Sequence, residues 1–157
     1  MAYARDERTS ERLDRNWQDI LQELRVIQTG VQLLAGFLLT LPFSARFDQL
    51  DAWQVRLYLA TVVVAALAVG ITLVPIVVHR RLFGELVKDH VVAIGHALSQ
   101  TVAALLGVLL VGILTLVFSV TVGWVAAAVV ATTATVSLVV LLVVVPAALL
   151  RRATRLQ

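Results

Sequence analysis

Cysteine is absent from this chain of 157 residues, and proline occurs only three times. The lack of cysteine excludes disulfide bonds, thiol catalysis and zinc–thiolate sites. Aspartate and glutamate are missing from the four longest apolar stretches, which cover residues 26–43, 55–78, 91–117 and 124–150. Antiporters that exchange protons for cations use a carboxylate inside the membrane, so this pattern argues against such a mechanism.

Apolar residues are abundant. Hydrophobic residues make up 60% of the chain and its mean hydropathy is +0.92, whereas a soluble domain contains about 45–50% apolar residues. Each of the four stretches has close to, or more than, the length of about 20 residues that crosses a bilayer as a helix. The sequence therefore predicts an all-α integral membrane protein, a four-helix bundle that has the lipid bilayer as its solvent.

Basic residues are distributed unevenly between the predicted spans. Eleven of the 13 lysine and arginine residues precede the first stretch, lie between the second and third, or follow the fourth. Only Arg46 and Arg56 lie near the connection between the first and second stretches. Positive residues mark the cytoplasmic side of a membrane protein. We therefore expect a multi-pass protein of the bacterial inner membrane with both termini in the cytoplasm, and no nucleic-acid partner.

These patterns divide the chain into five segments. Residues 1–25 are predicted to form a cytoplasmic amphipathic helical segment, frayed over residues 1–9, that continues into the first spanning helix as far as about residue 41. The others are a transmembrane hairpin (26–81), a cytoplasmic link (82–90), a second transmembrane hairpin (91–152) and a cytoplasmic tail (153–157). A bend of the first helix near Glu23 is the alternative to a continuous helix. Asp51 is expected to cap the second helix.

The two predicted hairpins resemble each other in sequence. When the chain is shifted by 71 positions, scarce residues coincide: Gly36 with Gly107, Phe47 with Phe118, Trp53 with Trp124, Thr61 with Thr132, Pro75 with Pro146, and Arg80 and Arg81 with Arg151 and Arg152. Repeated hairpins build many channels and transporters. We therefore predict two parallel-oriented helical-hairpin repeats related by rotation about the membrane normal; a chance match of helix ends is the alternative.

A polar stripe follows one side of the first helix. At about 100° per residue its members share one arc; they are Glu11, Asp14, Gln18, Gln22, Arg25, Thr29, Gln32, Gly36 and Thr40. The other side is apolar, with Leu13, Trp17, Ile20, Leu24, Ile27, Val31, Leu34 and Leu38. An amide facing lipid would leave its donors and acceptor unsatisfied, so the stripe is expected to meet other helices or water.

The third helix carries a weaker copy of this stripe, because His96, Gln100 and Gly107 correspond to Arg25, Thr29 and Gly36 after the shift. Two interpretations are open. The polar groups bond between packed helices, or they line a pore or cavity with Arg25 and His96 at its cytoplasmic entrance. On the second interpretation the lining residues are Arg25, Thr29, Gln32, Gly36, Thr40, His96, Gln100 and Gly107.

Pro75 and Pro146 lie near the inner ends of the second and fourth helices. Proline in a spanning helix frees a backbone carbonyl and permits a kink. Both are possible hinges of an inner gate, and static bends are the alternative.

No catalytic or metal-binding arrangement is visible in the sequence. His90 and His96 are six residues apart, which puts them about 120° out of phase on a helix. A glycine-rich phosphate loop is absent, and the serines have no evident histidine and acid partners. We therefore predict no enzymatic activity, no metal site and no cofactor.

The same residues carry a resemblance to a known family. The stretch RNWQDILQELRVIQTGVQLLAGFLLTLPF at 15–43, with HRRLF at 79–83 and VKDH at 87–90, resembles a domain-of-unknown-function family of small bacterial four-helix membrane proteins. The resemblance covers most of the chain and implies this fold without an established activity. Similar proteins are sometimes labelled sodium:proton antiporters, but the lack of a membrane-embedded carboxylate argues against that activity here.

The function that these patterns favour is the passage of an ion or a small polar solute across the membrane. Four helices leave little room for a wet lumen, so a homo-oligomer is expected to supply the path. The alternative is a non-conducting scaffold or partner subunit that docks another protein through its cytoplasmic helix. A path requires the polar stripe to face an axis between chains, whereas a scaffold buries the stripe within each chain.

The predicted topology can be tested with single cysteines, because the chain has none of its own. Asp48→Cys should react with impermeant thiol reagents added outside intact cells, since residue 48 lies on the outer connection. Glu85→Cys and a cysteine at the C-terminus should react only after the membrane is permeabilised. Labelling of Glu85→Cys from outside would show that the topology is wrong.

Overall fold

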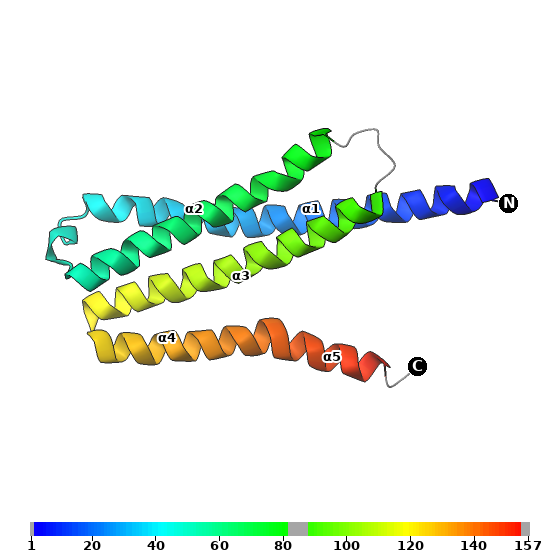
Figure 1. Cartoon of the computed structure of the whole chain (residues 1–157). Helices are drawn as coiled ribbons and strands as arrows, with labels where there is room; N and C mark the ends of the chain where they lie inside the picture. The colour runs from blue at the N-terminus through cyan, green and yellow to red at the C-terminus, as the bar shows by residue number, and fades with distance from the viewer. Residues whose placement is uncertain (1, 82–87, 155–157) are drawn as a thin grey trace. The chain divides into compact units, whose positions relative to one another are not determined.

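The chain folds entirely into helices and their short connections, as predicted. The computed structural model describes residues 2–81 and 88–154, with side chains described for residues 15–75, 77, 94–149, 151 and 152. The helices are α1 (Ala2–Thr40), α2 (Ala52–Arg81), α3 (Lys88–Thr121), α4 (Trp124–Val139) and α5 (Val145–Thr154) (Figure 1). Two 3-10 turns, Leu41–Phe43 and Phe47–Gln49, follow α1, and a π-helical turn, Val140–Val144, separates α4 from α5.

Four helical segments are long and apolar enough to cross a membrane. They are Arg15–Phe43, Ala52–Pro75, Ile94–Thr121 and Trp124–Leu149. Each overlaps one of the four stretches predicted from the sequence, and together they indicate a multi-pass membrane protein.

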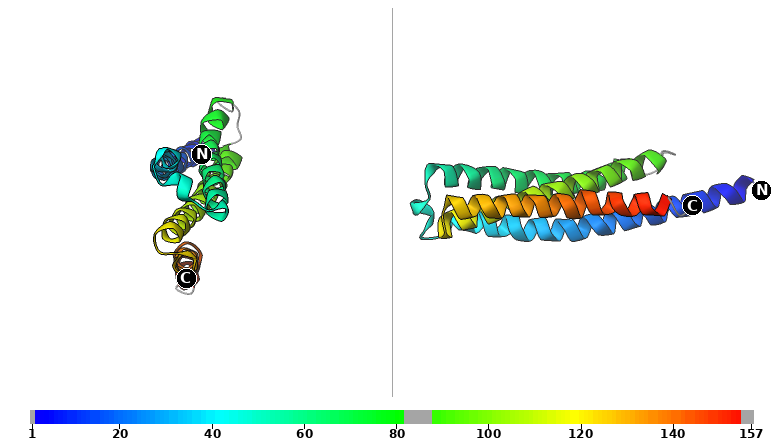
Figure 2. Two further views of the ribbon diagram at one scale, coloured as in Figure 1. Left: turned by 90° about the vertical axis from the view of Figure 1, so that its left-hand side faces the viewer. Right: turned by 90° about the horizontal axis from the view of Figure 1, so that it is seen from below.

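Helix α1 is longer than predicted. It starts at Ala2 and runs without interruption to Thr40 (Figure 2), so residues 2–9 are helical and the prediction of a frayed end was wrong. The sequence of this end, AYARDERT, is rich in alanine, arginine and glutamate, which favour a helix. The alternative of two helices separated near Glu23 does not apply.

The described chain forms two compact units. One consists of Met1–Ser44 and Val62–Leu106, and the other of Ala45–Thr61 and Gly107–Gln157. We call them the first and second units. The division falls within α2 and α3, so each unit draws on both of the predicted hairpins.

In the first unit, α1 packs through the apolar side that its sequence predicts. Ile20, Leu24, Val31 and Leu38 are buried. A Cβ atom built on Gly95 of α3 would lie only 2.8 Å from the Trp17 ring and 3.3 Å from Ile20. The absence of a side chain at Gly95 therefore lets α3 approach α1 closely. Nearby, the Ser99 hydroxyl donates to Glu23 Oε2 at 3.4 Å.

Helix α2 is buried along one continuous seam. Its buried residues recur at alternating spacings of four and three; they are Gln54, Tyr58, Thr61, Ala65, Ala68, Thr72 and Pro75. This is the spacing by which a helix keeps one face against its neighbours along its length. Thr61 and Thr72 bond backbone carbonyls of their own helix, at Leu57 and Val69, so their hydroxyls enter the seam already satisfied.

In the second unit, α2 and α3 meet at a glycine. A Cβ atom on Gly112 would lie 2.8 Å from Thr61 Oγ1 and 3.2 Å from its Cγ2. Thr61 is buried and its hydroxyl bonds the Leu57 carbonyl at 2.7 Å. Because that bond fixes the side-chain rotamer, Thr61 cannot easily make room for a larger residue.

The end of the second unit formed by residues 45–51 and 122–123, which we call the loop end, is held by a hydrogen-bond network. Asp51 Oδ1 accepts from the backbone N–H groups of Trp53 and Gln54, each at 2.8 Å, and Gln54 Oε1 accepts from the Asp51 N–H at 2.9 Å. This reciprocal arrangement is a capping box, and it confirms the predicted role of Asp51. Asp51 Oδ2 also accepts from the Trp124 indole at 3.2 Å, and Gln54 donates to the Ser119 hydroxyl at 3.4 Å.

The connection between α3 and α4 depends on one glycine. The N–H groups of Val122 and Gly123 both donate to the Phe118 carbonyl. Gly123 has a φ of 117°, which side-chain-bearing residues rarely adopt. This conformation allows α4 to start immediately, at Trp124.

Replacement of Gly112 should weaken the packing of α2 on α3. Gly112→Ala should lower the free energy of unfolding by about 1–3 kcal/mol, because the new methyl group overlaps Thr61. Gly70→Ala is the matched control, since a Cβ there meets nothing within 4 Å. Both can be compared by equilibrium unfolding in detergent micelles. Equal stability of the two variants would show that the approach at Gly112 is not constrained.

The loop end should be sensitive to acid through Asp51. Hydrogen bonds from the Gln54 N–H, the Trp124 indole and the Trp53 N–H lower the pKa of this carboxyl below 3.8, against a small opposing effect of desolvation. A lowered folded-state pKa means that the stabilisation is present above the unfolded value and is lost as the pH falls through the folded one. Wild type should therefore lose thermal stability between about pH 4 and about pH 2, and Asp51→Asn should lose less. Asp48→Asn, on the same loop, should behave like wild type.

Candidate functional site

The polar stripe of α1 lies on the surface of the chain. Arg25, Thr29, Gln32, Gly36 and Thr40 are all exposed, while the apolar residues on the opposite side of the helix are buried. The stripe is therefore turned away from the helices against which α1 packs. The arrangement expected for a scaffold, with the stripe buried within the chain, is not present.

The members of the stripe differ in how their polar groups are satisfied. Thr29 donates to the Arg25 carbonyl at 2.9 Å and Thr40 to the Phe37 carbonyl at 2.7 Å, so neither hydroxyl needs another partner. Gly36 has nothing within 4 Å of its Cβ position. The Gln32 amide makes no hydrogen bond within the described part of the chain, although Gln32 lies inside the span Arg15–Phe43. Gln32 is therefore the polar group on α1 that most needs a partner.

The counterpart on α3 is only partly exposed. His96 and Gln100 are exposed, but Gly107 is buried, and its Cβ position lies 3.6 Å from Leu138 of α4. Gly107 was predicted to line a path with these residues; instead it packs against α4, because the missing side chain admits Leu138. The two glycines that the 71-residue shift aligns, Gly36 and Gly107, thus have different surroundings.

The two prolines also differ. Pro75 is fully buried inside the continuous helix α2. Pro146 follows a π-helical turn, Val140–Val144, in which the backbone widens. Proline lacks an N–H and its ring crowds the carbonyl four residues earlier, and a π turn accommodates both effects. The predicted single fourth helix is therefore two α-helical segments joined by this turn.

An aromatic groove, which sequence reasoning missed, lies at the loop end of the second unit. Its volume is about 620 Å³, and it is lined by Trp53, Arg56, Leu57, Ala60, Thr115 and Trp124. The Arg56 guanidinium lies over the Trp53 ring, 4.8 Å from its centroid. The sequence signal was the pair Trp53 and Trp124, which we had assigned to anchoring at the membrane interface.

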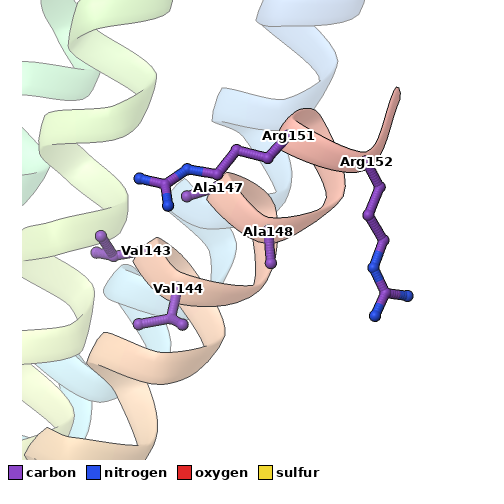
Figure 3. A pocket seen from close by; sticks show the side chains of 6 residues that line it. All are labelled: Val143, Val144, Ala147, Ala148, Arg151 and Arg152. Carbon is purple, nitrogen blue, oxygen red and sulfur yellow. The ribbon is translucent and has the colours of Figure 1, made fainter. Parts of the chain in front are cut away.

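A second groove lies beside the double arginine of α5. It has a volume of about 430 Å³ and is lined by Val143, Val144, Ala147, Ala148, Arg151 and Arg152. Figure 3 shows that the Arg151 and Arg152 side chains leave the helix in different directions (Figure 3). Their guanidinium groups do not converge, so they do not form a single anion clamp.

Metal-binding chemistry is not supported by the residues whose positions the structure gives. Among them, no group of three histidine, aspartate or glutamate side chains comes together. His79, His90 and Glu85 of the predicted cytoplasmic link lie outside the described side chains.

Comparisons with known proteins add a family but no activity. No curated protein and no solved structure matches the chain. Residues 6–146 match DUF6328, a family of unknown function, and this match covers most of the chain. This extent agrees with the resemblance drawn from the α1 sequence and from the segments around 79–90. The chain belongs to the DUF6328 family.

Proposed function

We propose that this protein forms a homo-oligomer in the membrane and that the exposed polar face of α1 lines a path for an ion or small polar solute. The observation that carries the proposal is the position of Gln32, which is exposed, inside a membrane span and without a hydrogen-bond partner in the described chain. The bacterial inner membrane remains the expected location.

The energetic argument starts from the amide itself. Moving an unpaired amide from water into hydrocarbon costs about 4–8 kcal/mol. Gln32 cannot reach the interface easily, because its side chain is short and its helix continues to Thr40. A partner must therefore come from water or from another chain, and a symmetric assembly around the stripe supplies either.

The charges near the stripe indicate how a path would select its solute. Arg25 lies on the same face about seven residues before Gln32, which is about 10 Å along the helix. A cation at the mouth of a narrow path raises the local concentration of anions and lowers that of cations. His96 and Gln100 are exposed on α3 in the same unit as α1 and extend the polar lining.

An internal duplication would also favour association through α4. The buried residues Leu24, Val31 and Leu38 of α1 fall 71 positions before buried residues of α3, at Gly95, Val102 and Leu109. The seam of α2 is different, because its counterparts on α4 are exposed: Val129 by 61%, Val136 by 57% and Val139 by 49%. In one repeat this face is covered by protein, and in the other it is available to a second copy.

A scaffold remains the second candidate, because α1 extends beyond its span. The helix begins at Ala2 whereas the span begins at Arg15, which leaves a length of about 20 Å of helix outside. Such an extension could dock another protein.

The path can be tested by replacing Gln32. Gln32→Leu keeps the side-chain size, so a stripe that faces water should keep its fold and oligomeric state and lose or change its flux. The measurement is flux of several anions, cations and polar solutes into liposomes that contain the purified protein. Leu33→Met is the matched control, because Leu33 is 75% exposed and lies off the stripe. Its flux should equal that of wild type.

Arg25 tests selectivity in the same liposomes. Arg25→Glu should shift the preference from anions toward cations, and the shift should weaken at high salt because the Debye length is about 8 Å at physiological ionic strength. A wild-type protein that is monomeric and passes no solute would contradict the proposal. Loss of about 0.5–2 kcal/mol of stability in Gln32→Leu, without flux in wild type, would instead favour a stripe that only bonds between chains.

A further inference from the structure

We propose that the aromatic groove at the loop end is a binding site for an anionic phospholipid. The site is independent of the α1 stripe and of any path along it. Its lining residues come from the start of α2, the end of α3 and the start of α4, all within the second unit.

The groove lies at the depth of lipid headgroups. Trp53 is the second residue of the span Ala52–Pro75, and Trp124 is the first residue of the span Trp124–Leu149. Indole rings favour this interfacial level. From there the groove continues along α2 past Leu57 to Ala60, over a length of about 10 Å, so one end is interfacial and the other lies beside acyl chains.

The polar groups of the groove favour an anion. The Thr115 hydroxyl donates to the Val111 carbonyl, and the Trp124 indole donates to Asp51. Both Asp51 oxygens are occupied by donors. Among the described residues of the groove, the groups left over are the Arg56 guanidinium and the Trp53 indole N–H, which are donors only. A phosphate diester, which offers only acceptors and a negative charge, matches them.

The same geometry disfavours a zwitterionic choline lipid. An aromatic ring can attract a quaternary ammonium through its face, but Arg56 already covers a face of Trp53 at 4.8 Å. A choline group would therefore meet a like charge. The apolar part of the groove, at Leu57 and Ala60, suits a glycerol backbone and the first methylene groups of an acyl chain.

The test uses the full-length protein in bilayers and the fluorescence of its own tryptophans. Brominated phosphatidylglycerol is exchanged for brominated phosphatidylcholine at equal mole fractions, and the quenching gives the relative affinity of the two lipids. Wild type should prefer phosphatidylglycerol about five-fold, the contribution of one basic residue near a charged headgroup. Arg56→Gln should remove this preference, and Arg46→Gln, the matched control outside the groove, should retain it.

Two further arms separate the explanations. Ala60→Leu fills the groove without changing charge and should also remove the preference, which covers the case in which Arg56→Gln fails to fold. Soluble glycerol phosphate at millimolar concentration should not compete, because it lacks acyl chains. Equal affinity for both lipids in wild type, equal loss in Arg46→Gln, or displacement by glycerol phosphate would each overturn the proposal.

Discussion

The hydrocarbon core of a bilayer offers no water to a polar group, and this constraint governs how the chain uses its polar residues. Each helix satisfies its own backbone. Most threonines in the spans then bond a carbonyl of their own helix, as Thr61, Thr115 and Thr132 do with the carbonyls four residues earlier. Such hydroxyls cost little wherever they lie. Gln32 is different, because an amide has two donors and cannot be satisfied in this way by its own turn.

The same constraint explains why side-chain hydrogen bonds between distant residues gather at the loop end. There the chain leaves helical conformation, and backbone N–H groups at the start of α2 lose their intrahelical partners. Asp51 and Gln54 replace those partners and at the same time reach Trp124 and Ser119. The cap of one helix thus also joins the start of α2 to the α3–α4 turn, so local and tertiary structure depend on the same two side chains.

Periodicity made the helices and the buried side of α1 predictable, because apolar residues at helical spacing have one physical outcome in a membrane protein. The Asp51 cap was predictable for a similar reason, since its geometry is local. The close approaches at Gly95 and Gly112 were not, because a glycine does not reveal which residue of another helix it admits. The aromatic groove was missed because Trp53 and Trp124 each have a sufficient explanation as anchors, and only the fold brings Arg56 and Thr115 beside them.

The π-helical turn before Pro146 has a consequence for how equal sequence spacing is interpreted. Trp53 and Pro75 are separated by the same number of residues as Trp124 and Pro146, but only the second interval includes a widened turn. One extra residue in a turn rotates everything after it by about 100° around the helix axis. Side chains that follow it, such as Arg151, therefore point in a different azimuth from the one that register alone assigns. Two copies of one segment can in this way acquire different surfaces without an insertion or a deletion.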